Sequence, residues 1–594
     1  MTLSRKNHYL TSITSMLRSG RHVALSNSKR KTFSMALFAS LLRVVIILSS
    51  SVAAALSQNK SSKINHDHIA AHTLLKSSCS ATFYPELCFS AISSLPPQAV
   101  SKIKSPKDVI ELSLNLTITA VEHNYFTIEK LVNTRKGLTK REKTSLYDCL
   151  EMVDDTLDEL HETEQELQGY PTFHNKSISE QADDLKILLS AAMTNQQTCV
   201  DGFSHDRADK KVREALIEGQ MHVFHMCSNA LAMIKNVTDT DMASEVLYSS
   251  AGRHLEEENE REWPEWLSPV DRRLLQATTL TPDVIVAADG SGNYLTVGAA
   301  VAAAPERSSS RYIIRIKAGV YKENVEVPKK KINIMFVGDG RLDTIITGSR
   351  NVVDGSTTFN SATVAVVGDR FLARDITFQN TAGPSKHQAV ALRVGSDLSA
   401  FYRCDMLAYQ DTLYVHSLRQ FYVSCYISGT VDFIFGNAAA VFQNCDIHAR
   451  RPNPGQRNLV TAQGRDDINQ NTGIVIQKCR IGGTEDLLAA KSSFATYLGR
   501  PWRLHSRTVI MQSDISDVVH PAGWFEWSGD FALDTLFYRE YANTGAGALT
   551  SGRVVWQGFK EFTSATEAQP FTAGNFIAGS SWLGSTGFPY SLGL

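Results

Sequence analysis

Two aspartates with a fixed spacing are the first candidates for chemistry in this chain. Asp411 lies in the segment YQDTLY and Asp432 lies 21 residues later in GTVDFIFG. Two carboxyl groups held close together repel as anions, so one keeps its proton while the other ionises. Such a pair supplies a proton donor and a nucleophile or base from one residue type. Aspartates are also common at turns, so the spacing needs a structural repeat behind it.

The surroundings of Asp432 make its charge costly. Val431, Phe433 and Phe435 flank it in an apolar stretch. A carboxylate buried among apolar side chains requires a partner that pairs with it. We therefore expect a partner for Asp432 from another part of the chain.

A repeat of about 20 residues supplies the missing structural frame. An aromatic residue precedes a cysteine by three positions in Phe401–Cys404, Tyr422–Cys425 and Phe442–Cys445, with weaker copies at Phe378 and at Ile476–Cys479. Short β-rich runs broken by Gly, Asn and Asp fill the region from about residue 281. This period without helices is typical of a strand solenoid, most simply a parallel β-helix. Residues one coil apart then lie on adjacent strands, ~4.8 Å apart, so the repeat predicts that Asp411 and Asp432 are neighbours.

The first half of the chain has a helical pattern instead. Apolar residues recur at steps of three and four, with acids on the other face of the helix: Leu146, Leu150, Val153, Leu157 and Leu160. This period predicts a helical bundle over residues 70–238. The run HETEQE at 161–166 is a solvated helix face rather than a metal site. We expect disulfides Cys79–Cys88 and Cys149–Cys199, which leaves Cys227 unpaired.

The N-terminus resembles a targeting segment. Residues 1–31 are basic and contain no Asp or Glu, and an apolar stretch, interrupted by Arg43, runs over 36–56. A cleaved secretory signal is favoured over a signal anchor. Glycosylation sequons lie only between residues 59 and 236, at Asn59, Asn115, Asn175 and Asn236. This clustering suits a secreted protein, in an oxidising compartment that permits disulfides.

The length of 594 residues and a net charge of −1 set further limits. The length predicts two or more domains, and the charge argues against nucleic-acid binding. Because no C-x-x-C pair occurs, a zinc ribbon or a thioredoxin-like site is not expected. Residues 239–280 look like a linker, and the cluster at 272–275, Arg-Arg-Leu-Leu, is a candidate processing site.

Five motifs in the second half resemble the motif set of plant pectin methylesterases, in the same order and with matching spacing. They are GVYKENV (319–325), QAVALR (388–393), YQDTLY (409–414), GTVDFIFG (429–436) and LGRPW (498–502). The resemblance covers about 281–590, and the helical half resembles the inhibitor domain found as a pro-region in longer members. It implies a right-handed parallel β-helix, preceded by an all-α bundle, that hydrolyses galacturonate methyl esters in pectin and releases methanol.

The resemblance also implies a role for each matched residue. Asp432 would be the nucleophile, Asp411 the proton donor and later the base, and Arg500 the group that holds Asp432. Amide groups stabilise a developing oxyanion without adding charge. The remaining matched positions are Gln410 as transition-state stabiliser and Gln388, Thr358 and Trp502, with Arg500, as substrate contacts. No metal or cofactor is assigned.

The same resemblance implies partners, a location and a disulfide. The partners would be pectin, proteinaceous pectin methylesterase inhibitors and a subtilisin-like processing protease, with transient membrane association through the apolar N-terminal segment. The enzyme would be secreted to the cell wall. Neighbouring cysteines on successive coils can pair in more than one way, and family members favour Cys425–Cys445, leaving Cys404 and Cys479 as buried thiols.

Two other functions remain open. A β-helix glycoside hydrolase acting on pectin would also use two carboxylates, although the paired glutamines and Arg500 fit ester chemistry better. Alternatively, the chain is a precursor whose main role is inhibitory binding through its helical half. A serine esterase is not favoured, because we find no G-x-S-x-G segment in an α/β pattern.

Overall fold

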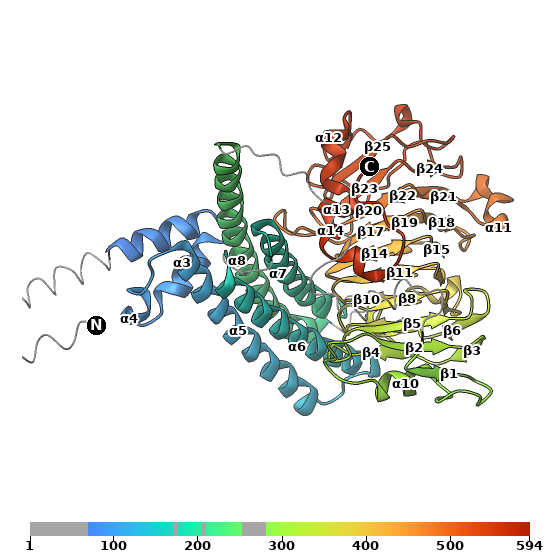
Figure 1. Ribbon diagram of the computed structural model, residues 1–594, viewed down its shortest axis with the longest axis horizontal. Coiled ribbons are helices and arrows are strands. Elements are labelled where there is room, and N and C mark those ends of the chain that lie inside the picture. The colour runs from blue at the N-terminus through green and yellow to red at the C-terminus, as the bar shows by residue number, and fades with distance from the viewer. Residues whose placement is uncertain (1–68, 172–175, 204–209, 252–280) are drawn as a thin grey trace, which may run out of the picture. The chain divides into compact units, whose positions relative to one another are not determined.

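The computed structural model describes residues 69–171, 176–203, 210–251 and 281–594 of the chain (Figure 1). Residues 73–594 form one compact unit, and residues 1–72 form another, of which only 69–72 are described. The proposed signal segment at 36–56, the sequons at Asn59 and Asn175, and the candidate processing site at 272–275 lie outside the described residues. Among the described helices, none is long and apolar enough to cross a membrane.

Helices form the first part of the compact unit, as the apolar period predicted. They are α3 (Pro85–Ser93), α4 (Pro97–Val100), α5 (Pro106–Thr134), α6 (Lys140–Gly169), α7 (Ile178–Asp201) and α8 (Lys210–Ala251). Helices α5, α6 and α7 each begin with a capping box, in which a Ser or Thr side chain and an acid three residues later satisfy the first free N–H groups. Helix α8 continues to Ala251, past the boundary expected at residue 238.

Two disulfides tie these helices together. Cys79 is bonded to Cys88, and Cys149 on α6 is bonded to Cys199 on α7. Cys227 is a buried free thiol. All three outcomes match the expected pairing.

The second part is the predicted parallel β-helix, built from three sheets whose paired strands are all parallel. Sheet A contains β1 (Val284–Val286), β2 (Tyr312–Ile316), β5 (Ile334–Gly338), β8 (Leu372–Arg374), β11 (Ser399–Tyr402), β14 (Arg419–Val423), β17 (Ala439–Gln443), β20 (Gly473–Gln477), β23 (Arg507–Met511), β25 (Phe537–Tyr541) and β26 (Phe559–Glu561). Sheet B contains β24 (Asp514–Ile515), β21 (Arg480–Gly483), β18 (Asp446–Ala449), β15 (Tyr426–Gly429), β12 (Asp405–Leu407), β9 (Thr377–Asn380), β6 (Thr344–Gly348) and β3 (Gly319–Lys322). Sheet C contains β22 (Thr496–Gly499), β19 (Asn458–Gln463), β16 (Ile434–Gly436), β13 (Leu413–Val415), β10 (Leu392–Val394), β7 (Val364–Val366) and β4 (Val325–Val327).

Short helices complete the second part. Helix α10 (Val297–Ala303) and helix α11 (Glu485–Leu488) lie in the connections between strands. Near the C-terminus, α12 (Ala565–Ala568), α13 (Ala573–Phe576) and α14 (Gly579–Trp582) supply buried residues to the outer face of sheet A. Ile187 and Leu188 of α7 belong to the same apolar cluster.

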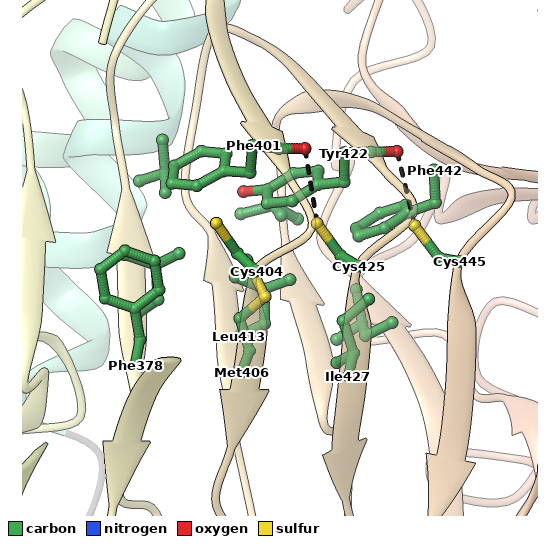
Figure 2. Close-up of a cluster of buried hydrophobic side chains, with 14 of the residues drawn as sticks. Phe378, Phe401, Cys404, Met406, Leu413, Tyr422, Cys425, Ile427, Phe442 and Cys445 are labelled. Carbon is green, nitrogen blue, oxygen red and sulfur yellow. Dashed lines mark hydrogen bonds between the residues drawn. The ribbon is translucent and has the colours of Figure 1, made fainter. Parts of the chain in front are cut away.

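The aromatic-x-x-Cys repeat forms a ladder inside the solenoid (Figure 2). Phe401, Tyr422 and Phe442 are register partners on β11, β14 and β17, and their rings stack with centroids 4.9 and 4.6 Å apart. Residues 20 or 21 positions apart thus occupy the same place on successive coils, which is why like side chains stack there. The repeat read from the sequence is therefore the coil of the fold.

The predicted disulfide Cys425–Cys445 is wrong in this structure. Both residues are buried free thiols, as are Cys404 and Cys479. The Sγ of Cys425 donates to the Phe401 carbonyl at 3.4 Å, and that of Cys445 donates to the Tyr422 carbonyl at 3.5 Å (Figure 2). These two sulfurs thus donate to the backbone of the preceding coil and remain thiols.

Thiol titration checks this arrangement. We expect the chain, denatured without reductant, to react with five equivalents of a thiol reagent, because five cysteines are free. The Cys404→Ala variant serves as the control and should give one equivalent fewer. If the unmodified chain reacted with only three equivalents, two of these five cysteines would form a disulfide, and the predicted pairing in the second half would stand again.

Candidate active site

Asp411 and Asp432 occupy equivalent positions on adjacent coils. Each lies two residues before a strand of sheet C, and Leu413 on β13 pairs with Ile434 on β16. The Asp411 N–H donates to the Val431 carbonyl at 3.0 Å. Both aspartates have left-handed backbone angles, with φ of 62° and 51°, a conformation that Asp tolerates better than most residues. The neighbour relation expected from the repeat is therefore present.

Arg500 is the partner that Asp432 requires. Arg500 directly follows β22, and its N–H donates to the Thr461 carbonyl at 3.0 Å. Its Nε donates to Asp432 Oδ1 at 2.8 Å and its Nη2 to Oδ2 at 2.5 Å. The guanidinium also lies over the Trp527 ring, 4.3 Å from the centroid. This bidentate contact fixes the plane of the carboxylate and balances its charge.

Asp411 lacks such a partner, and its protonation differs for that reason. Burial raises the pKa of Asp411 well above the usual value, the negative charge of Asp432 raises it further, and Arg500 opposes the rise. The side chain therefore holds its proton to a higher pH than an ordinary aspartate does. One coil apart, the two aspartates have different environments: one is buried with a raised pKa, and the other is bound by an arginine.

The two glutamines lie on the same strip of backbone. The Ala389 N–H donates to the Gln410 carbonyl at 3.3 Å, which places Gln388 one coil before Gln410 and next to the aspartate pair. Both residues are half-buried. Amide N–H groups at these positions are suited to an oxyanion formed between the coils.

Thr358 and Trp502 lie at the margins of this strip. Thr358 precedes a short 3₁₀ turn, Phe359–Ser361, and the Ser361 Oγ accepts the Val390 N–H at 3.1 Å. Thr358 therefore lies one coil before Gln388. Trp502 packs on an apolar cluster with Phe435, the ring centroids being 6.1 Å apart.

An aromatic row beside the aspartates was missed by the sequence reasoning. Tyr414 stacks on Phe435 with centroids 4.2 Å apart, and Phe435 meets Trp502 edge to face. A signal for the first two was available, since an aromatic residue follows each aspartate by three positions. Flat apolar faces in a row of this kind suit the rings of a polysaccharide.

The helices α6 and α7 lie against this surface in the full chain. Met152 of α6 belongs to the same apolar cluster as Tyr414 and Phe435. The Asn437 amide donates to Thr194 Oγ1 of α7 at 2.8 Å. The acids of α6 that the sequence placed on a face away from the apolar stripe are partly buried here, among them Asp148 and Glu159.

Comparison with known proteins agrees with the two-part fold. The family described as pectinesterase matches residues 283–580, and the family described as plant invertase/pectin methylesterase inhibitor matches residues 73–233. Pectinesterase 1 of Citrus sinensis is 66% identical over 97% of both chains. Pectinesterase/pectinesterase inhibitor U1 of Solanum lycopersicum is 65% identical, covering 95% of this chain and 97% of that one.

A solved structure covers the second part. The pectin methylesterase from carrot is 74% identical, with a TM-score of 0.53, over 54% of this chain and 100% of that chain. A parallel β-helix with paired carboxyl groups, joined to an inhibitor-like helical part, defines the class as a two-part polysaccharide-modifying enzyme. The chain belongs to the pectinesterase family, as the five motifs indicated.

Removal of the Asp432 charge tests the electrostatic coupling in the site. In Asp432→Asn the pKa of Asp411 should fall, because the neighbouring negative charge is gone while Arg500 remains. The infrared carboxyl band, assigned by difference against Asp411→Asn, follows this titration. The control Asp446→Asn changes an acid on sheet B and should leave the band unmoved. An unchanged Asp411 pKa in Asp432→Asn would contradict the coupling.

Proposed function

We propose that this chain hydrolyses the methyl esters of galacturonate units in pectin, with Asp432 as nucleophile and Asp411 as acid and base. The observation that carries the assignment is the pair itself: a carboxylate bound by Arg500 stands one coil from an acid whose pKa is raised. A nucleophile must be ionised and a donor protonated at the same pH, and these environments meet both needs.

The first half of the reaction forms an acyl-enzyme. An Asp432 oxygen attacks the ester carbonyl, and the amides of Gln388 and Gln410 stabilise the oxyanion that results. The tetrahedral intermediate collapses by breaking the bond to the methoxy oxygen. Asp411 gives its proton to that oxygen, so methanol leaves as a neutral molecule and Asp411 becomes an anion.

The second half regenerates the enzyme. Asp411, now a base, removes a proton from water, and the hydroxide attacks the acyl carbon bound to Asp432. The Asp432 carboxylate leaves and pairs again with Arg500, and the product is galacturonic acid, which releases its proton to solvent and becomes a free carboxylate. One water is consumed, one methanol is released, and both aspartates recover their starting states.

Asp432→Asn tests the nucleophile directly. We expect methanol release from methylated pectin to fall by at least about 10³-fold, since a neutral amide is a poor nucleophile. The exposed Asp530 provides a matched control, because Asp530→Asn alters a carboxylate outside the site. Retained methanol release in Asp432→Asn would refute the nucleophile assignment. Reducing ends in place of methanol from the unmodified chain would favour the glycoside hydrolase.

We also propose that residues 70–238 act as a pro-domain, followed by a linker over 239–280 and a catalytic domain over 281–590. Cleavage by a subtilisin-like protease at Arg272–Leu275 would separate the parts during secretion to the cell wall. Contacts of α6 and α7 at the candidate site support an inhibitory role for the helical part. Mass spectrometry of the secreted N-terminus checks the cleavage, and an N-terminus before Arg272 in active enzyme would exclude it.

The contact between the two parts should depend on pH. Burial against the β-helix raises the pKa of Asp148 and of Asp155 to about 7. In a separated helical part both would return to the ordinary value of about 4. Since the pKa values are higher in the contact, ionisation weakens it progressively as pH rises from about 4 to about 7.

A chain cleaved between the two parts makes this measurable. The Kd of the helical part for the β-helix should rise by at least about tenfold from pH 5 to pH 7. The double variant Asp148→Asn/Asp155→Asn should show a flatter pH dependence, whereas Glu122→Gln, at an exposed position on α5, should keep the dependence of the unmodified protein. A Kd that is constant with pH in the unmodified protein would contradict the prediction.

A further inference from the structure

The helical part places two carboxylates on two arginines of the β-helix. Glu151 of α6 accepts a hydrogen bond from Arg393 Nη2 at 3.3 Å. Asp201 of α7 accepts from Arg503 Nη2 with both oxygens, each at 2.6 Å. Both arginines therefore hold a carboxylate that belongs to the other part of the chain.

The two arginines lie at opposite ends of the aromatic row. Arg393 on β10 is the register partner of Tyr414 on β13, and its guanidinium lies 3.4 Å from the Phe359 ring centroid. Arg503 lies next to Trp502, 5.3 Å from that ring centroid. The row runs from Tyr414 on β13 through Phe435 on β16 to Trp502, so one arginine lies beside each end of it.

The spacing of the two acids is set covalently. Glu151 follows Cys149 by two residues, and Asp201 follows Cys199 by two residues. The Cys149–Cys199 disulfide therefore holds the two acid-bearing segments together. The carboxylates of Glu151 and Asp201 are therefore held at a fixed spacing opposite Arg393 and Arg503.

Within the described part of the β-helix, no carboxylate forms an ion pair with Arg393, although the charge of Glu326 on β4 acts on it. Arg393 is 4% exposed, and its buried Nε has no hydrogen-bond partner among the described residues. By contrast Arg419, another arginine at the contact, keeps a bidentate bond to Asp397 of the β-helix in addition to Asp184 of α7. Departure of the helical part would leave Arg419 paired and leave Arg393 and Arg503 without their carboxylates.

We propose that Arg393 and Arg503 are binding sites for free galacturonate carboxylates of partly de-esterified pectin, and that Glu151 and Asp201 imitate those carboxylates in the full chain. The inference rests on the proposed esterase function and extends it to the acidic product. A polymer that lies along the aromatic row and carries free carboxylates at both ends would satisfy both arginines. Such a polymer and the helical part then compete for one surface.

The experiment uses the full chain with a specific protease site inserted within residues 252–280, cleaved after folding and freed of the helical part. Oligogalacturonate without esters is the probe, and calorimetry gives its Kd. Arg393→Gln and Arg503→Gln should each weaken binding by about tenfold, the effect of losing one charged hydrogen bond. Arg480→Gln, an exposed arginine on sheet B paired with Asp446, is the matched control and should bind like the unmodified protein. Fully methyl-esterified oligomer should bind no more weakly to the variants than to the unmodified protein.

A second variant tests the proposal even if Arg393→Gln does not fold. In the uncleaved chain, Glu151→Gln/Asp201→Asn leaves both arginines in place and removes their occupants. This double variant should bind oligogalacturonate at least about tenfold more tightly than the uncleaved parent. Equal binding there, or equal Kd values for all arginine variants, would overturn the proposal. Polyglutamate binding that falls equally in these variants would also overturn it, by showing response to charge alone.

The esterase function and the carboxylate sites can be refuted independently of each other. Methanol release from fully methylated pectin by the unmodified cleaved enzyme reports on the esterase function. If methanol is released but oligogalacturonate binding ignores Arg393 and Arg503, only the carboxylate sites are refuted. If no methanol is released, the esterase function is refuted whatever binds.

Discussion

The parallel hydrogen bonding between successive coils is the constraint on which the rest of this structure depends. It places Leu413 opposite Ile434, 21 residues later, so that Asp411 and Asp432, two positions before them, are neighbours. The same register stacks Phe401, Tyr422 and Phe442 inside the solenoid. An insertion between the two aspartates would change this one-coil spacing and could separate their side chains only by shifting the register of the coil. The short distance between the two carboxyl groups therefore depends on the length of the coil that separates them.

The environment of each buried aspartate then sets how readily it ionises. Asp432 is held by two charge-assisted hydrogen bonds from Arg500, whereas Asp411 is buried without a cation of its own, and burial raises its pKa. The contact with the helical part uses the same physical rule on a larger scale. Arg393 and Arg503 meet Glu151 and Asp201 there, because an arginine covered by another domain needs a carboxylate.

Much of this arrangement could be predicted from residue patterns, and the exceptions have physical causes. The aromatic-x-x-Cys period predicted the solenoid, because a stacked core demands like residues at like positions. The Cys425–Cys445 disulfide failed because the spacing of coils permits a bond without requiring one, and the thiols donate to carbonyls instead. The acids of α6 looked solvent-facing because an apolar stripe alone does not reveal a second contact surface.

The sequence by itself determined the period, the family motifs and therefore the pairing of Asp411 with Asp432, since these are properties of local order along the chain. Only the tertiary structure decided that Arg500, 68 residues beyond Asp432, binds it with both nitrogens, and that Tyr414, Phe435 and Trp502 form one row. It alone also matched Glu151 and Asp201 to Arg393 and Arg503. These contacts join residues that are far apart in the sequence. Each residue pairs with whichever charge or apolar face the folded chain brings within a few ångströms of it. No periodicity in the chain encodes that choice.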